Sequence, residues 1–207
     1  MDKKAAILTA AQEVFGANGF SRATIKMIAD KANVAFGLVS HYFGDKNKLF
    51  LLSGFDMVNS LLEHVRKEAK DAPNGLEAVR AFITGYFSFV MRRRRTFPIL
   101  LHCTPFSEEG VLIDRTAIAK KFQELIDEVE AYLARGIKDG SIKELPLCET
   151  AFIIYAIIVG AVRTRLVAQY GVPNLFEETV EFVIRSLAVN GGLSSEPQAL
   201  SGEKPAS

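Results

Sequence analysis

The 207-residue sequence has two cysteines, three histidines and no tryptophan. Two cysteines are too few for a disulfide framework, and the spacing of Cys103 and Cys148 does not resemble a metal site, so we expect reduced thiols and no bound metal. None of the histidines stands at a catalytic spacing from a cysteine, serine or carboxylate, and there is no glycine-rich phosphate loop. The sequence therefore predicts a protein that is not an enzyme, with no catalytic residues and no cofactor.

Long hydrophobic segments are also scarce. The longest apolar run, Ala151 to Val162, stops at Arg163 and is shorter than the roughly 18 residues that a membrane span needs. We expect this run to form a buried helix. Met1 to Lys4 lead directly into an amphipathic pattern, without the apolar core of a secretory signal. These features predict a cytoplasmic protein with no membrane partner.

The charge is nearly balanced overall, at a formal +1, but it is unevenly distributed. Residues 1–50 contain seven basic and four acidic side chains, whereas the rest of the chain has a small acidic excess. A basic N-terminal part on an acidic body is typical of a nucleic-acid-binding domain joined to a second domain.

Almost every segment carries apolar residues at helical spacing, and none has a convincing strand period. For example, Ile7, Ala11, Val14 and Phe15 share one helix face, and the pattern stops at Asn18-Gly19. The sequence therefore predicts an all-α fold with about nine helices.

Two short helices are predicted close together, over Thr24–Ala32 and Phe36–Phe43. The three residues between them suit the corner of a helix-turn-helix, because Asn33 tolerates a positive φ and Val34 can fill the angle between the helices. The second helix is then presented outward, where it can enter the major groove of DNA.

The residues from Ala5 to Leu49 resemble the DNA-binding domain of the tetracycline-repressor (TetR) family of bacterial regulators. The resemblance rests on these residues: Ile7, Ala10, Ala11, Phe15, Gly19, Phe20, Thr24, Ile28, Ala29, Ala32, Val34, Gly37, His41, Tyr42, Phe43, Lys46 and Leu49. It implies a helix-turn-helix domain over residues 1–47, followed by a ligand-binding and dimerisation domain over residues 48–190. Residues 191–207 are rich in Gly, Ser, Pro, Glu and Gln, and we expect a disordered tail there.

The resemblance implies that double-stranded DNA is a partner and assigns roles to the exposed residues of the domain. Base edges would be read by Phe36, Gly37 and Ser40, and Ala35 stands at the start of the reading helix, where the family has a capping serine. Phosphate contacts are expected from Thr24, Lys26, His41, Tyr42 and Lys46. Phe43 is expected in the core, and Tyr42 suits a core position as well as a phosphate contact.

The family also forms dimers, and two helices supply interface candidates. Ala156, Gly160 and Thr164 make a stripe of small residues, and the final helix contributes Val180, Val183 and Leu187. The alternative for the stripe is close packing inside one subunit.

An apolar or aromatic effector is implied by the aromatic residues of the second domain. The predicted ligand-binding residues are Tyr86, Phe89, Phe97, His102, Phe106, Phe122, Tyr155 and Arg163, with His102 or Arg163 as polar anchors. A cationic effector held by aromatic rings stays open at this point.

The function predicted from these features is a ligand-responsive transcriptional regulator, a homodimeric repressor released from a palindromic operator by its effector. The alternative is a helical small-molecule-binding or protein-interaction module with a vestigial helix-turn-helix. Ala35, Phe36 and Ser40 keep that alternative open, because they depart from the residues usual in the family. The basic run Arg92–Arg95 is expected to be a solvated helix end.

Overall fold

The computed structural model describes residues 2–105, 114–168 and 171–189. Over these residues the chain forms nine helices and no strand, which confirms the all-α prediction. The helices are α1 (Lys3–Arg22), α2 (Ile25–Ala32), α3 (Phe36–Phe43), α4 (Lys46–Ala69), α5 (Gly75–Arg92), α6 (Ile99–His102), α7 (Arg115–Asp139), α8 (Leu147–Leu166) and α9 (Leu175–Leu187). The predicted tail, residues 191–207, lies outside the described residues.

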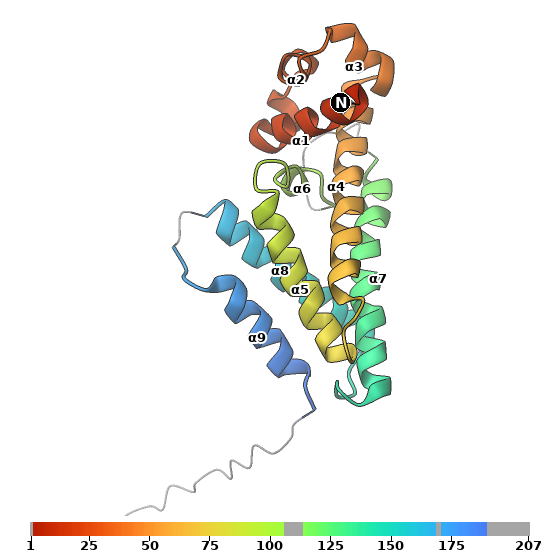
Figure 1. The fold of residues 1–207 in the computed structure, drawn as a ribbon, viewed down its shortest axis with the longest axis vertical. Coiled ribbons are helices and arrows are strands. Elements are labelled where there is room, and N and C mark those ends of the chain that lie inside the picture. The colour runs from red at the N-terminus through yellow and green to blue at the C-terminus, as the bar shows by residue number, and fades with distance from the viewer. Residues whose placement is uncertain (1, 106–113, 169–170, 190–207) are drawn as a thin grey trace, which may run out of the picture.

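At one end of the molecule, α1 and the two short helices α2 and α3 stand on a longer helical body (Figure 1). The long helix α4 runs from the first group into the second, packing on α1 and further along on α5 and α7. The ring of Phe50 in α4 meets that of Phe15 in α1 edge to face, with the centroids 5.0 Å apart. Both rings are buried, so the hydrophobic core is continuous between the two groups.

Helix boundaries follow from local capping. Thr24 and Asp45 accept hydrogen bonds from the backbone N–H groups of Met27 and Lys48, which caps α2 and α4. Such caps each contribute about 0.5–2 kcal/mol. Near the end of α1, Gly19 has a φ of 69° and interrupts the helical geometry, as the stop predicted at Asn18-Gly19 requires.

Polar contacts and one close backbone approach hold the N-terminal helices on the body. The buried Gln12 amide donates to Asp56 in α4 over 2.8 Å. Glu13 in α1 forms ion pairs with Lys31 in α2 and with Arg95 beyond α5. Gly16 of α1 lies directly against the backbone at the start of α6, where a Cβ atom would meet the Ile99 nitrogen at 3.0 Å.

Helix α8 differs from the fully buried helix that we predicted. Ile154 and Ile158 pack inward, but Phe152 and Ile153 are exposed on the other face, Ile153 by 59%. By length and composition alone α8 could also cross a membrane, yet helices in the cores of soluble proteins pass the same criterion. Its inner face packs on α7 and α9, and its outer apolar face is uncovered in the single subunit.

Candidate functional site

The corner between α2 and α3 has the geometry that its sequence predicts. Asn33 adopts the left-handed conformation, with φ 52° and ψ 51°, and ends α2. The Val34 N–H then bonds back to the Ala29 carbonyl over 3.0 Å, which closes the turn. Val34 itself is half-buried against the core. The backbone therefore turns sharply over residues 33–35, and this turn sets the direction of α3 relative to α2.

Helix α3 is anchored by one face and presents the other to solvent. Val39 and Phe43, one turn apart, are buried, which confirms the core position expected for Phe43. Phe36 is 58% exposed and Tyr42 is 42% exposed. Gly37 lies one residue after Phe36, and a Cβ atom there would meet nothing within 4 Å. The residues predicted at base edges thus share an open surface of the domain.

The first turn of α3 has no side-chain cap. Ala35 occupies the N-cap position in extended conformation, and no side chain accepts a hydrogen bond from the first amides of the helix. The Leu38 N–H bonds back to the Ala35 carbonyl over 2.9 Å. The amides of Phe36 and Gly37 before it lack a side-chain acceptor and are left to water or to a partner.

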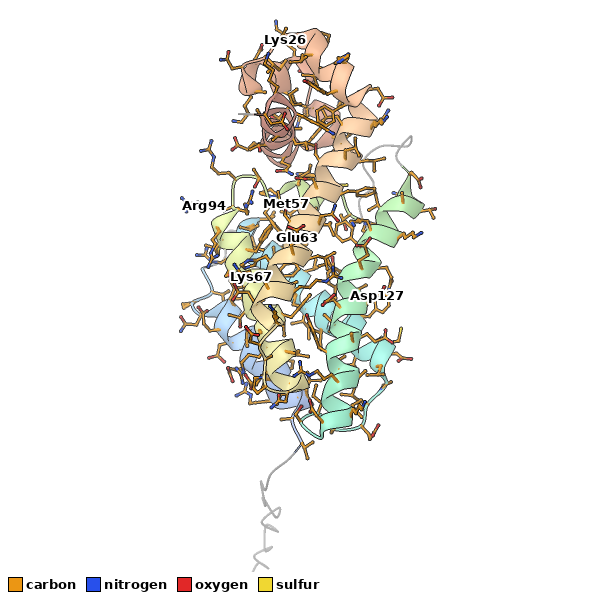
Figure 2. All side chains as sticks on the ribbon, turned by 45° about the vertical axis from the view of Figure 1, so that its right-hand side comes forward. Lys26, Met57, Glu63, Lys67, Arg94 and Asp127 are labelled. Carbon is orange, nitrogen blue, oxygen red and sulfur yellow. The ribbon has the colours of Figure 1, made fainter. Side chains whose placement is uncertain are left out.

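The expected phosphate contacts differ in their surroundings. Lys26 is exposed at the outer end of the domain (Figure 2), and Thr24, Ser40 and His41 are exposed as well. Lys46 is half-buried instead, with its ammonium 4.4 Å from the centroid of the Phe20 ring and 3.4 Å from the Ser21 carbonyl oxygen. Lys46 is thus engaged within the domain, and Lys26 is the more accessible cation.

Residues 7–52 match the family model described as bacterial regulatory proteins, tetR family. These residues accordingly form a DNA-binding domain of the TetR family. Its relatives include the uncharacterized HTH-type transcriptional regulator YhgD of Bacillus subtilis, 23% identical over 163 residues, or 78% of this chain and 83% of YhgD. The HTH-type transcriptional regulator BetI of Stenotrophomonas maltophilia is 38% identical over 72 residues, which span 33% of this chain and 36% of BetI.

The fold is shared over most of the chain with solved TetR structures. The transcriptional regulator FadR from Bacillus subtilis, solved in complex with stearoyl-CoA, superposes with a TM-score of 0.75 at 21% identity. The superposition covers 87% of this chain and 97% of FadR. With the family-model match and the relatives named HTH-type transcriptional regulators, the chain is a DNA-binding transcriptional regulator, and these relatives point away from an enzyme.

A cavity of about 280 Å³ lies among α5, α6, α7 and α8. Five of the eight predicted ligand-binding residues line it: Tyr86, Phe97, Phe122, Tyr155 and Arg163. The lining residues that the sequence prediction missed are Leu100, Leu101, Thr104, Val159 and Val162. Val159 and Val162 follow Tyr155 by four and seven residues, so helical register on α8 could have identified them.

The other three predicted ligand residues lie elsewhere. Phe89 is buried with its ring tilted against His64 and with Arg93 over it, and it is not among the lining residues. His102 is at the end of α6 and is not among the lining residues. Phe106 is outside the described residues. Phe89 and His102 thus lie outside the lining of this cavity, because sequence spacing cannot give the rotation of a helix against its neighbours.

Two tyrosine hydroxyls are the main polar groups inside this cavity. Tyr86 and Tyr155 both line the cavity, and each phenol influences the pKa of the other. Burial raises the pKa of both phenols well above the ordinary value, so both keep their protons at neutral pH. The edge of the Phe97 ring approaches Tyr86 with a centroid distance of 6.0 Å. The cavity is therefore an aromatic and aliphatic chamber with a hydroxyl pair in its wall.

The residues predicted for the dimer interface divide into two groups. Ala156 and Gly160 are exposed on α8 and Thr164 is half-exposed, and a Cβ atom on Gly160 would meet nothing within 4 Å. On α9, Val180, Val183 and Leu187 are buried in the core of the subunit and offer no surface to a partner. The outward face of α9 carries Phe182 instead, which is 59% exposed.

The basic run beyond α5 is exposed, as expected. Helix α5 ends at Arg92, and the following residues form turns. Arg93 lies over the Phe89 ring, and Arg95 pairs with Glu13. At least part of this run therefore contributes to packing within the subunit.

Proposed function

We propose that this chain is a homodimeric repressor that leaves a palindromic operator when a small apolar or aromatic effector fills the cavity. The observation that carries the proposal is the exposed face of α3. The domain that contains α3 packs on α4 and α6, and α6 contributes residues to the cavity lining. We infer that the protein works in the cytoplasm, where the chromosome is accessible to it.

On DNA, α3 would lie in the major groove with Phe36 against thymine methyl groups. Gly37 would let the backbone approach the base edges, and Ser40 would supply a hydrogen bond. Lys26 would fix the orientation by contact with a phosphate. The ring of Phe36 exposes apolar surface to water in the free protein, which is unfavourable, and contact with DNA would bury that surface.

Dimerisation would use the outer faces of α8 and α9. Phe152 and Ile153 on α8 and Phe182 on α9 leave apolar surface uncovered in the subunit. The open space at Gly160 allows a second helix to come close. A twofold pair would present two α3 helices, and two half-sites about 34–36 Å apart would then be read together.

Helix α6 would couple the effector to DNA. Leu100 and Leu101 line the cavity, while the neighbouring Ile99 lies against Gly16 of α1. At the other end of α6, the Cys103 side chain packs directly on Gly54 of α4. A ligand that moves α6 would therefore displace both α1 and α4. A displacement that weakens operator binding by about 1–3 kcal/mol lowers the affinity about 5–150-fold, and DNA must weaken effector binding equally.

The size of the cavity indicates the size of the effector. Ligand pockets commonly measure about 300–1,000 Å³, and the cavity here is at the lower end. FadR of Bacillus subtilis was solved with stearoyl-CoA, a much larger compound. We therefore propose a smaller effector for this chain.

The DNA-reading assignment can be tested with duplexes that the protein selects from a random library. Lys26→Ala should weaken binding to all duplexes alike and lower the salt dependence by about one unit of slope. Phe36→Ala should instead change the preferred sequence. Lys67→Ala, on the body far from α3 (Figure 2), is the control and should alter neither property. Uniform loss in both test variants, or no selected sequence at all, would contradict the assignment.

The dimer can be tested by sedimentation. Ile153→Arg places a charge in the proposed interface and should yield monomers that have lost specific DNA binding. Leu52→Arg changes an exposed leucine of α4 and should leave the dimer intact. A monomeric parent protein would refute the proposal directly.

A further inference from the structure

Two tyrosine hydroxyls stand in the wall of the cavity. Tyr86 on α5 and Tyr155 on α8 both line it, and each phenol influences the pKa of the other, so the two hydroxyls lie close together. Each phenol O–H can donate one hydrogen bond. Over the described residues, no hydrogen bond from either hydroxyl to a third residue is found.

Two phenol donors favour a ligand that supplies an acceptor. A ligand oxygen beside them would accept from these O–H groups, and a charged oxygen would do so more strongly than a neutral one. Because burial holds both phenols in the protonated form, the donors persist throughout the neutral pH range.

The charge of the lining residues indicates the sign of the ligand. Arg163 on α8 reaches the cavity and is exposed, and no ion pair of Arg163 is found over the described residues. The described lining contains no aspartate or glutamate. A cationic ligand would meet Arg163 without a compensating carboxylate, whereas an anion would be attracted to it.

The remaining walls specify the body of the ligand. Six of the lining residues are hydrocarbon side chains: Phe97, Leu100, Leu101, Phe122, Val159 and Val162. They can surround an alkyl or aromatic group but cannot bond to a polar one. The lining is thus mainly apolar, with the two tyrosine hydroxyls, Thr104 and Arg163 as its polar residues.

We infer that the effector is a compact carboxylic acid, with an alkyl or aromatic body among the cavity side chains and its carboxylate bound by the tyrosine pair and Arg163. This assignment rests on the proposed function and names the chemical class of its effector. It excludes the cationic effector that the aromatic residues alone leave open.

Calorimetry on the full-length protein tests the acid against matched neutral and cationic compounds. One set is phenylacetate, phenylacetamide and phenethylamine, and a second set is hexanoate, hexanamide and hexylamine. In each set that fits, the acid should bind about tenfold or more tightly than the amide, with the amine weakest, because hydrogen bonds to charged groups are the stronger ones. If no acid binds more tightly than its amide and amine, the assignment is overturned.

Variants separate the contribution of charge from that of the hydroxyl pair. Arg163→Gln should abolish the preference for acid over amide, while Arg165→Gln, two residues later and outside the cavity lining, should retain it. The double variant Tyr86→Phe with Tyr155→Phe should weaken acid and amide alike, by about 5- to 100-fold. Tyr132→Phe, whose hydroxyl bonds to Glu128 elsewhere, is its control. A preference that survives Arg163→Gln would overturn the role of the guanidinium.

The same preparations distinguish this inference from the proposed function. A protein that binds a selected duplex and is released by an amine or amide would remain a regulator, and the acid assignment would fail. A protein that binds acids through Arg163 but selects no duplex would keep the acid site, and the proposed function would fail.

Discussion

Gly37 offers a test in which stability and DNA binding should change in opposite directions. It lies in the first turn of α3, where glycine is a weak helix former. A Cβ atom would meet nothing within 4 Å, so alanine fits without any rearrangement of the free protein. Gly37→Ala should therefore raise the free energy of unfolding by about 0.5–1 kcal/mol. For a chain of this size that corresponds to a melting temperature higher by about 1–4 °C.

Binding to the selected duplex should become weaker in the same variant. If the backbone at Gly37 approaches the base edges, the added methyl group occupies space that DNA needs. Loss of a base contact costs about 1–3 kcal/mol in each half-site. Nonspecific binding depends on phosphate contacts and should stay unchanged.

The two effects are measured by thermal unfolding and by fluorescence anisotropy with selected and unrelated duplexes. Unrelated DNA serves as the internal control, because a misfolded domain would lose both kinds of binding. A variant that melts lower than the parent would contradict the open space at Gly37. A variant that binds the selected duplex as tightly as the parent would show that α3 does not approach DNA through this residue.

Three further outcomes follow from the local geometry. Asn33→Ala should lower the free energy of unfolding by about 1 kcal/mol in denaturant titrations, because alanine is strained in the left-handed conformation, whereas Asn33→Gly should not. Gly75→Ala should destabilise the protein by about 3 kcal/mol or more, since its methyl group would overlap the Gly136 backbone, and unchanged melting would refute that contact. With Ellman's reagent at neutral pH, the exposed Cys148 should react at once, while Cys103 should react only on unfolding, because burial raises its pKa to about 12.

The helices and the turn could be predicted from the sequence because local residues determine them. Thr24 and Asp45 cap helices through their own side chains, and Asn33 tolerates the left-handed corner. Contacts between distant helices could not be predicted in this way. The direct approach of Gly75 to Gly136 joins α5 to α7, and no local pattern indicates which glycines meet.

The candidate sites show the same division. Tyr86, Phe122 and Tyr155 reach one cavity, and Phe43 is in the core, as expected. The interface candidates on α9 lie instead in the core of the subunit. The sequence of an amphipathic helix shows one apolar stripe, but it does not show whether the core or a partner covers that stripe. Phe182 lies off that stripe, and only the packed structure shows that it is exposed.

Residues that lower the folding stability of a single subunit lie on the proposed partner surfaces. Helix α3 begins without a side-chain cap, carries Gly37 in its first turn and exposes Phe36. Helix α8 exposes Ile153 and leaves empty space at Gly160. Each feature costs free energy in a single chain in water, through unbonded amides, backbone entropy or exposed apolar area. A groove of DNA at α3 and a second subunit at α8 would offset these costs. The local deviations from stable folding therefore support the two interfaces independently of the resemblance to known regulators.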